Sequence, residues 1–379
     1  MQSKHKSLWL IPFVFIVVVM VWFFTRDYPP KIKLSSAEEK HMNELLSDMR
    51  THCVGRYLID LPASFTLSTG TEPLEEEQWV ADINWPDRSY KAYIASKRMY
   101  YPAFEQLLKR REKELSETRT ANPVNMPFLK KIWPLPAGMK GIIFERNLDT
   151  SADDALRTLE AYVHSNDVAI KIQKKSANDL SPRYKKDRER RGSETNYIPG
   201  DIDKINDLLS RIRGRESGEV PREPGSCIAN AFIAIDKSGR EQEDITLLFS
   251  SKKLPGVNIE VSTNNFLQSD DSLLDRAGEI SDAYSRVNAS ILAKGSRKIN
   301  SLKAEEMIAS GPKPGSNNPI YIFSLYVNEM QGSNRTPWLN FNLSNESNAI
   351  IPYTGYTQDE LIMFWNAITQ TIRMRPGAN

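Results

Sequence analysis

The chain is poor in the side chains that most often carry catalysis. Its 379 residues include only four histidines and two cysteines, so few imidazole bases, thiol nucleophiles or soft metal ligands are available. Its 50 lysines and arginines are nearly balanced by 48 aspartates and glutamates, which leaves no strong basic field for a phosphate backbone. The composition therefore disfavours a metal centre and a nucleic-acid partner.

The sequence signatures of nucleotide-binding and serine-hydrolase sites are missing as well. Neither a glycine-rich phosphate loop nor a G-x-S-x-G nucleophile elbow occurs. Acidic pairs such as Asp153-Asp154 leave a carboxylate mechanism of the glycoside hydrolase type open, but they lie in turn-like segments and are expected to be solvated. We therefore expect a protein that is not an enzyme, with no catalytic residues, no cofactor, no metal and no small-molecule substrate.

One long apolar run lies near the amino terminus. Leu8 to Phe24 contains no charged residue, and as a helix it would extend about 26 Å, close to the ~30 Å hydrocarbon core of a bilayer. The alternative is a cleaved signal peptide, but the following residues offer no small-residue cleavage site and no cysteine for lipidation. We expect an uncleaved, single-pass inner-membrane anchor over residues 1–27, with the body of the chain in the periplasm.

The chain after this segment repeats one pattern. Cys53-Val-Gly-Arg-Tyr-Leu-Ile-Asp60 resembles Cys227-Ile-Ala-Asn-Ala-Phe-Ile-Ala-Ile-Asp236, because each has a cysteine, an aliphatic residue and a strand that ends near an aspartate. Alternating runs downstream, such as GVNIEVS and WLNFNLS, predict antiparallel strands with one packed face. Apolar residues at helical spacing predict helices over 102–118, 202–212 and 272–287 and at the carboxyl terminus. Two unrelated sandwiches that converged on this order are the alternative interpretation.

The predicted fold class is α+β, with an N-terminal transmembrane helix followed by two tandem, related domains whose antiparallel sheets are covered by helices. We expect the first domain over residues 28–215, a linker rich in glycine, proline and charge over 216–226, and the second domain over 227–379. Ser35 is the predicted N-cap of a short helix that lies against the first domain.

A charge-rich stretch over residues 181–194 interrupts the first domain. We expect it to be a solvated loop. The alternative is a basic patch for a partner or for anionic lipid headgroups.

The two cysteines are the only pair available to an exported protein. An oxidising periplasm would allow Cys53 and Cys227 to join, and the bridge would tie the first strand of one domain to that of the other. The alternative is two buried free thiols at equivalent places in two related domains. The sequence leaves both interpretations open.

With CVGRYLIDLP at residues 53–62 and GSCIANAFIAID at 225–236, the chain resembles the immunity proteins that guard Gram-negative bacteria against the fourth class of type VI secretion phospholipase effectors. The resemblance covers about residues 35 to 375. One departure is Asn230-Ala231, where a glycine before the aromatic residue is more familiar. The resemblance implies a non-catalytic, two-armed clamp that grips its cognate lipase effector in the periplasm and keeps the lid of the lipase from opening.

We predict contact residues for the partner from residue type alone. Binding energy in tight interfaces concentrates in a few aromatic or arginine side chains. The candidates are aromatic residues in loop-like contexts, with two glutamates of a neighbouring acidic run: Glu75, Glu76, Trp79, Tyr100, Tyr101, Trp133, Tyr353 and Tyr356. For each aromatic residue, packing in a core is the competing interpretation. The competing function is a membrane-anchored periplasmic chaperone or ligand-sensing domain without an inhibitory role.

Overall fold

The computed structural model describes residues 28–69, 74, 78–86, 90–313, 319–345 and 355–379. The expected anchor over residues 1–27 lies outside them. Within the described ranges, no helix is long and apolar enough to cross a bilayer. The same ranges form one 13-stranded sheet and two three-stranded sheets, all antiparallel.

The large sheet is built from two sets of six strands. In the first half these are β4 Ala81–Asn84, β5 Ala92–Arg98, β6 Leu129–Pro134, β7 Lys140–Asn147, β8 Leu156–Ser165 and β9 Val168–Ala177. In the second half they are β13 Gln242–Ser251, β14 Asn258–Asn264, β15 Ser290–Ile299, β16 Leu302–Pro312, β17 Pro319–Val327 and β18 Trp338–Ser344.

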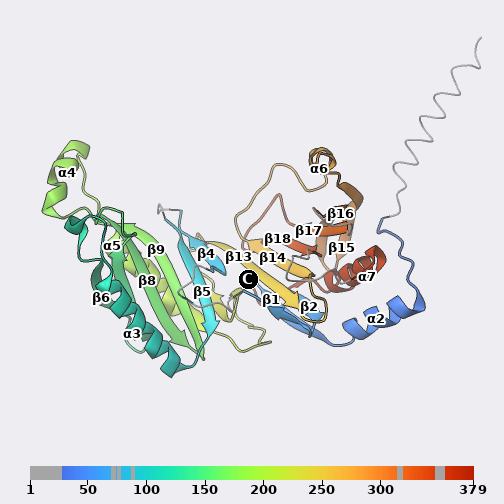
Figure 1. Cartoon of the computed structure of the whole chain (residues 1–379), viewed down its shortest axis with the longest axis horizontal. Coiled ribbons are helices and arrows are strands. Elements are labelled where there is room, and N and C mark those ends of the chain that lie inside the picture. Colours follow the sequence, from blue (N-terminus) through green and yellow to red (C-terminus); the bar gives the residue numbers. More distant parts are fainter. Residues whose placement is uncertain (1–27, 70–73, 75–77, 87–89, 314–318, 346–354) are drawn as a thin grey trace, which may run out of the picture.

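The two halves have the same topology. The strand order is β4-β5-β9-β8-β7-β6 in the first half and β13-β14-β18-β17-β16-β15 in the second. In each half, the first two strands are followed along the chain by a helix, four strands and a second helix, apart from short insertions in the first half. Figure 1 shows the first half at the left and the second at the right. The repeat that the cysteine motifs indicated is therefore a repeat of topology.

The halves join edge to edge. β4 pairs with β13, and Asp82 lies opposite Asp244 at this junction. A short strand, β3 (Phe65–Leu67), also pairs with β13. The two domains thus share one continuous sheet, which removes two strand edges that would otherwise be open to pairing.

One face of this sheet carries the first helix of each half. α3 (Tyr101–Glu117) packs Phe104 into a cluster on β5, β7, β8 and β9. α6 (Ala277–Ser285) packs Ala277 against Met307 of β16. Both helices were predicted from apolar spacing, and both are confirmed, α6 with a later start.

The other face carries the second helix of each half and the main core. α5 (Ile198–Arg211) packs on β8 and β9. α7 (Gln358–Thr369) starts with a capping box and places the fully buried Trp365 between Phe323 and Phe341, at ring-centroid distances of 5.3 and 5.2 Å. Packing of this apolar face supplies most of the stability that such helices need.

The two cysteine hairpins are exchanged between the halves. β1 (Met49–Val54) and β2 (Tyr57–Pro62) precede the first half in sequence, but β2 pairs with β19 (Arg373–Met374) at the end of the second half. β11 (Gly225–Ile228) and β12 (Ala231–Ala234) precede the second half, but β12 pairs with β10 (Ile212–Gly214) at the end of the first. Each half is therefore completed by the hairpin of the other.

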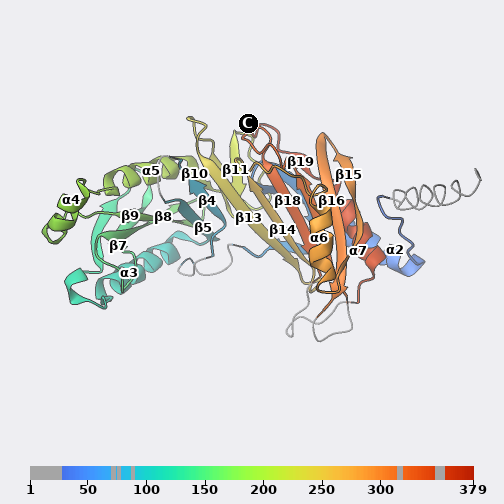
Figure 2. The same cartoon turned by 90° about the horizontal axis from the view of Figure 1, so that it is seen from above.

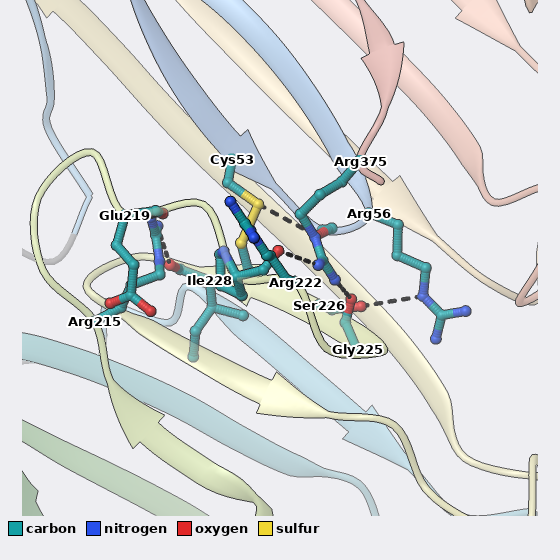
Figure 3. The surroundings of a disulfide bond; sticks show 12 residues. Cys53, Arg56, Arg215, Glu219, Arg222, Gly225, Ser226, Ile228 and Arg375 are labelled. Carbon is teal, nitrogen blue, oxygen red and sulfur yellow. Dashed lines mark hydrogen bonds between the residues drawn. A yellow bond between two sulfur atoms is a disulfide. The ribbon is translucent and has the colours of Figure 1, made fainter. Parts of the chain in front are cut away.

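A disulfide joins the exchanged hairpins (Figure 3). Cys53 and Cys227 are both buried, and their Cα atoms lie 5.7 Å apart. Gly55, in the turn of the first hairpin, has φ +54°, and an added Cβ would lie 2.4 Å from Cγ2 of Thr263. Only glycine fits this close approach of the first hairpin to the second half.

Arg56 and Tyr57, which follow Cys53 and Gly55 in the first motif, also bind the β1–β2 hairpin to its surroundings. Arg56 is 1% exposed, and its guanidinium lies 2.9 Å from the Glu243 carboxylate and donates to Ser226 Oγ at 3.3 Å. The Tyr57 hydroxyl donates to Pro337 O at 2.5 Å. The whole Cys-x-Gly-Arg-Tyr motif therefore serves to hold one half of the molecule against the other.

Removing the Arg56 charge should destabilise the protein strongly. Arg56→Met leaves Glu243 buried without its cation, and we expect a loss of about 3–5 kcal/mol in the free energy of unfolding. Urea denaturation measures it. The double variant Arg56→Met/Glu243→Gln should recover part of the loss, whereas a single-variant loss below about 1 kcal/mol, the size of an exposed pair, would contradict a buried ion pair.

The second hairpin turns at Ala229-Asn230. Asn230 has φ +56°, in the left-handed region. Asparagine enters this region more readily than other non-glycine residues. This turn therefore adopts a left-handed conformation at Asn230 without a glycine.

Two local expectations need correction. α2 (Ser36–Leu46) has the predicted Ser35 cap, but it packs mainly on α7 of the second half and only secondarily on β2, with His41 Nδ1 at 3.5 Å from Glu360 Oε1. The stretch 181–194 is not simply a loop, because α4 (Lys185–Arg191) forms within it and ends at a glycine in the left-handed region. The N-cap signal did not indicate which half α2 packs on, and charge content did not indicate α4.

A buried ion-pair network fixes α3 to the sheet. The Glu160 carboxylate, 0% exposed, lies 2.8 Å from Arg111 Nη2 and 2.6 Å from Arg146 Nε. Burial alone would raise the pKa of Glu160, but Arg146 and Arg111 outweigh it and lower the pKa from 4.5 to about 2. The negative form of Glu160 is therefore favoured by folding.

This network predicts a pH dependence of stability. Because the pKa of Glu160 is lower in the folded chain, its contribution is complete above about pH 5 and is lost as the pH falls towards 2, by about 3 kcal/mol in total. Urea titrations at pH 6 and pH 3 measure the slope. Glu160→Gln should be less stable at pH 6 and show a shallower slope, and an unchanged slope would count against the assignment.

Candidate functional site

Among the residues that the structure describes, no helix covers the middle strands on the α3 and α6 side of the sheet. α3 lies over β7 and β8, and α6 lies over β15. Figure 2 shows β13 and β14 between the two helices. Cross-strand pairs place Asp82 beside Asp244, Thr246 beside Ser262, and Ser262 beside Asn340. We call this surface the central face; it consists of Asp82, Asn84, Tyr93, Asp244, Thr246, Leu248, Glu260, Ser262, Trp338, Asn340 and Asn342, all partly exposed or exposed.

The middle of the central face is acidic. Asp82 and Asp244 face each other across the junction of the two halves, and Lys91 Nζ lies 2.6 Å from Asp82 Oδ2. Burial, followed by the charge of Asp82, raises the pKa of Asp244. With Glu260 on the neighbouring strand, the surface favours cationic or hydrogen-bond-donating groups of a partner.

Several polar atoms of the central face have no partner. Trp338 Nε1, Asn340 Oδ1 and Asn342 Oδ1 are buried atoms without a hydrogen bond to any residue that the structure describes, and they occupy alternate positions of β18. An unpaired buried polar group costs about 1–3 kcal/mol.

Exposed apolar side chains lie around the polar residues of the central face. Leu248 is 39% exposed, and Tyr90, Phe266 and Ile322 are 37%, 37% and 36% exposed. Tyr90 and Phe266 line a depression of about 450 Å³ over the junction of β4 and β13. Exposed apolar side chains close to polar groups are found in many protein interfaces.

Of the residues predicted from the sequence, Trp79 lies beside this surface. Its ring is 5.5 Å from that of Tyr93, and Lys171 Nζ lies 5.2 Å from its centroid. Tyr100 and Tyr101 lie at the start of α3; Tyr100 is 75% exposed, and Tyr101 packs on His164 at 5.3 Å.

The other predicted residues do not gather there. Trp133 lies on β6, at the outer edge of the first half, and its Nε1 donates to Glu145 at 3.0 Å. Tyr356 is 8% exposed and donates to Lys253 O, so its environment is that of a core residue. Glu75, Glu76 and Tyr353 lie outside the described residues. The small polar residues of β13, β14 and β18 were missed, although the alternation in GVNIEVS and WLNFNLS marked them as one unpacked face.

Family models match both halves of the chain. The model for the Tle cognate immunity protein 4 N-terminal domain matches residues 50–215, and that for the C-terminal domain matches residues 219–377. Together they cover most of the chain. No curated protein matches it.

Solved structures share the fold. Apo immunity protein TplEi of the type VI secretion system from Pseudomonas aeruginosa is 22% identical, with 86% of this chain and 97% of that chain covered and a TM-score of 0.61. A chain in a crystal structure of a Tle4–Tli4 complex is 21% identical, with 87% and 98% covered and a TM-score of 0.62. TplEi complexed with "L" peptide is 21% identical, with 87% and 99% covered and a TM-score of 0.59. At these identities the structures support the fold, and the family models carry the assignment. The chain belongs to the Tle cognate immunity protein 4 family.

Proposed function

We propose that the chain neutralises its effector, a type VI secretion phospholipase, by clamping it on the central face between α3 and α6. As a member of its family, the chain is a non-catalytic immunity protein that binds an effector. Occupation of the central face by the lid of the lipase, or by the segment next to its active site, would keep phospholipid from the catalytic residues.

The observation that carries this proposal is the uncovered stretch of sheet at the junction of the halves. The opposite face of the same strands carries the main core. The central face instead offers unpaired polar atoms, three carboxylates and exposed apolar residues to the same side. A stable inhibitor complex buries about 800 Å² on each partner, and two helices flanking several strands provide a surface of that order.

We also propose that the body works in the periplasm and that Leu8 to Phe24 anchors it to the inner membrane as a single-pass helix. The apolar run supports the anchor, and the disulfide suits an oxidising compartment. Tethering would raise the local concentration of the inhibitor at the bilayer that the lipase attacks. We take residues 28–215 and 227–379 as the two domains and 216–226 as their linker.

Co-expression tests the function. A cognate phospholipase effector is exported to the periplasm of a sensitive host, alone or together with the full chain. We expect lysis in the first case and growth in the second. A catalytically inactive lipase variant controls for the burden of export, and lysis despite full expression of the chain would reject the immunity function.

A further inference from the structure

A second cleft lies on the opposite side of the sheet, beside the disulfide. β1, β3, the segment after β10 and the side chains of Leu247 and Phe249 line this cleft of about 300 Å³. Leu247 and Phe249 alternate along β13 with Thr246 and Leu248 of the central face. The cleft therefore opens away from the surface proposed for the effector.

The cleft is basic. It is lined by Arg50, Arg98 and Arg215 against a single carboxylate, that of Glu216. Arg98 donates to Arg215 O at 2.7 Å and lies 4.0 Å from the Glu216 carboxylate, whose side chain is 77% exposed. Arg50 is exposed, and its guanidinium makes no ion pair within the described part of the chain. Three cations around one enclosed space attract an anion.

Arg215 is the buried member of this group. It is 9% exposed; its guanidinium donates to Glu219 O at 2.7 Å and Ile228 O at 3.4 Å (Figure 3), and its Nε has no partner. No carboxylate of the described residues lies within 4.0 Å of it, and burial lowers its pKa to about 10. Burying a cation without a counter-charge is costly.

The internal repeat supplies a comparison for Arg215. Arg375 follows β19 as Arg215 follows β10, and the backbone N–H of each donates to the turn of the neighbouring hairpin, at Arg56 O and Asn230 O. The Arg375 guanidinium donates to three backbone carbonyls, those of Pro221, Glu223 and Gly225. Arg215 has fewer acceptors and lines the cleft, so its remaining hydrogen-bonding capacity points to a ligand.

A second unpaired group faces the same space. His52 Nε2 is buried without a hydrogen bond, and the imidazole packs edge-on against Phe249 at 5.0 Å. Burial lowers the pKa of His52 to about 4, so the neutral ring can donate one hydrogen bond to an oxyanion. Phe65 and Phe249 add an apolar wall beside these polar groups.

We propose that this cleft binds a carboxylate side chain from an acidic segment of a protein partner. The planar guanidinium fork matches a carboxylate, and the two phenylalanines can contact the methylene groups of a glutamate. A flat membrane surface cannot bring a phosphate to a guanidinium that is 9% exposed inside a cleft, whereas a single side chain can enter it.

The test uses the full chain in dodecyl maltoside micelles and a fluorescein-labelled peptide of six glutamates, with the glutamine peptide as the neutral control. Fluorescence anisotropy at low salt should show saturable binding of the glutamate peptide alone. Arg50→Gln/Arg98→Gln should weaken it about tenfold, as expected for charge-assisted hydrogen bonds. Arg335→Gln, which removes an exposed arginine outside the cleft, should leave it unchanged.

Arg215→Gln would also remove contacts that hold its own loop, so it is not the deciding variant. The deciding variant is Arg50→Gln/Arg98→Gln, and its melting temperature shows whether it is folded. Equal affinity of the wild type and the double variant would overturn the proposal. An equal loss of affinity in Arg335→Gln would also overturn the proposal, because it would indicate diffuse electrostatic attraction to the whole surface. Displacement of the peptide by millimolar inorganic phosphate, or cleft-dependent binding to phosphatidylglycerol vesicles, would make the site a phosphate site and overturn it as well.

Discussion

Replacement of both cysteines by serine is expected to lower the free energy of unfolding by about 5 kcal/mol in the chain-entropy model, because the bridge closes a loop between residues 174 apart. Cys53→Ser/Cys227→Ser leaves no lone thiol to react. The hairpins that the bridge joins complete opposite halves of the molecule. We therefore expect both halves to lose stability together, in one unfolding transition.

Urea denaturation with and without dithiothreitol measures this effect. The reductant should move the midpoint of the wild type to that of the double variant and leave the variant unchanged. A variant as stable as the oxidised wild type would contradict the role assigned to the bridge. Two separate transitions in the variant would instead contradict the coupling of the halves through exchanged hairpins.

Leu248→Arg is expected to weaken binding of the effector on the order of a hundredfold, because it places an unpaired charge inside the proposed interface. Leu248 is 39% exposed on the central face, so the substitution should leave the fold intact. Leu180→Arg is the matched control, since Leu180 is 42% exposed but follows β9 near α4, away from the central strands. Biolayer interferometry with the purified effector measures both affinities, and co-expression shows whether growth is lost in parallel.

The two variants together separate a surface effect from a stability effect. Equal melting temperatures with unequal affinities would locate the contact on the central face. If Leu180→Arg weakened binding as much as Leu248→Arg, the effector would have to lie elsewhere or extend over the outer end of the first half.

Local features of the fold could be predicted from the sequence. Apolar spacing located α3, α5 and α7, and Ser35 marked the start of α2, because helical periodicity and capping depend on neighbouring residues. The cysteine motifs likewise indicated the repeat. For the helices, the signal and the structure lie within one short segment.

The long-range strand pairings could not be predicted from the sequence. Nothing in the short strand around Asp82 indicates that it pairs with the strand around Asp244, and nothing in the motif at Cys53 indicates that its hairpin completes the other half. Such pairings depend on residues more than 150 positions apart, which local pattern does not encode.

The central face was not predicted from the sequence for a related reason. The sequence predicted contacts at aromatic residues in loops, but Tyr356 is buried in the core and Trp133 lies at an outer edge. The central face consists largely of asparagine, serine, threonine and aspartate on strands. In one strand these residues look like an ordinary solvated side, and only the junction of the halves assembles them into one surface.

Photocrosslinking in the periplasm would test most directly where the effector lies. p-Benzoylphenylalanine is placed at Leu248 and Phe266 near the junction of the halves, and at Leu180 and Ile132 as sites of similar exposure at the outer parts of the first half. If the effector is clamped on the central face, irradiation should link it to the first two positions and not to the others. Crosslinks from Leu180 or Ile132, with none from Leu248 and Phe266, would contradict that placement.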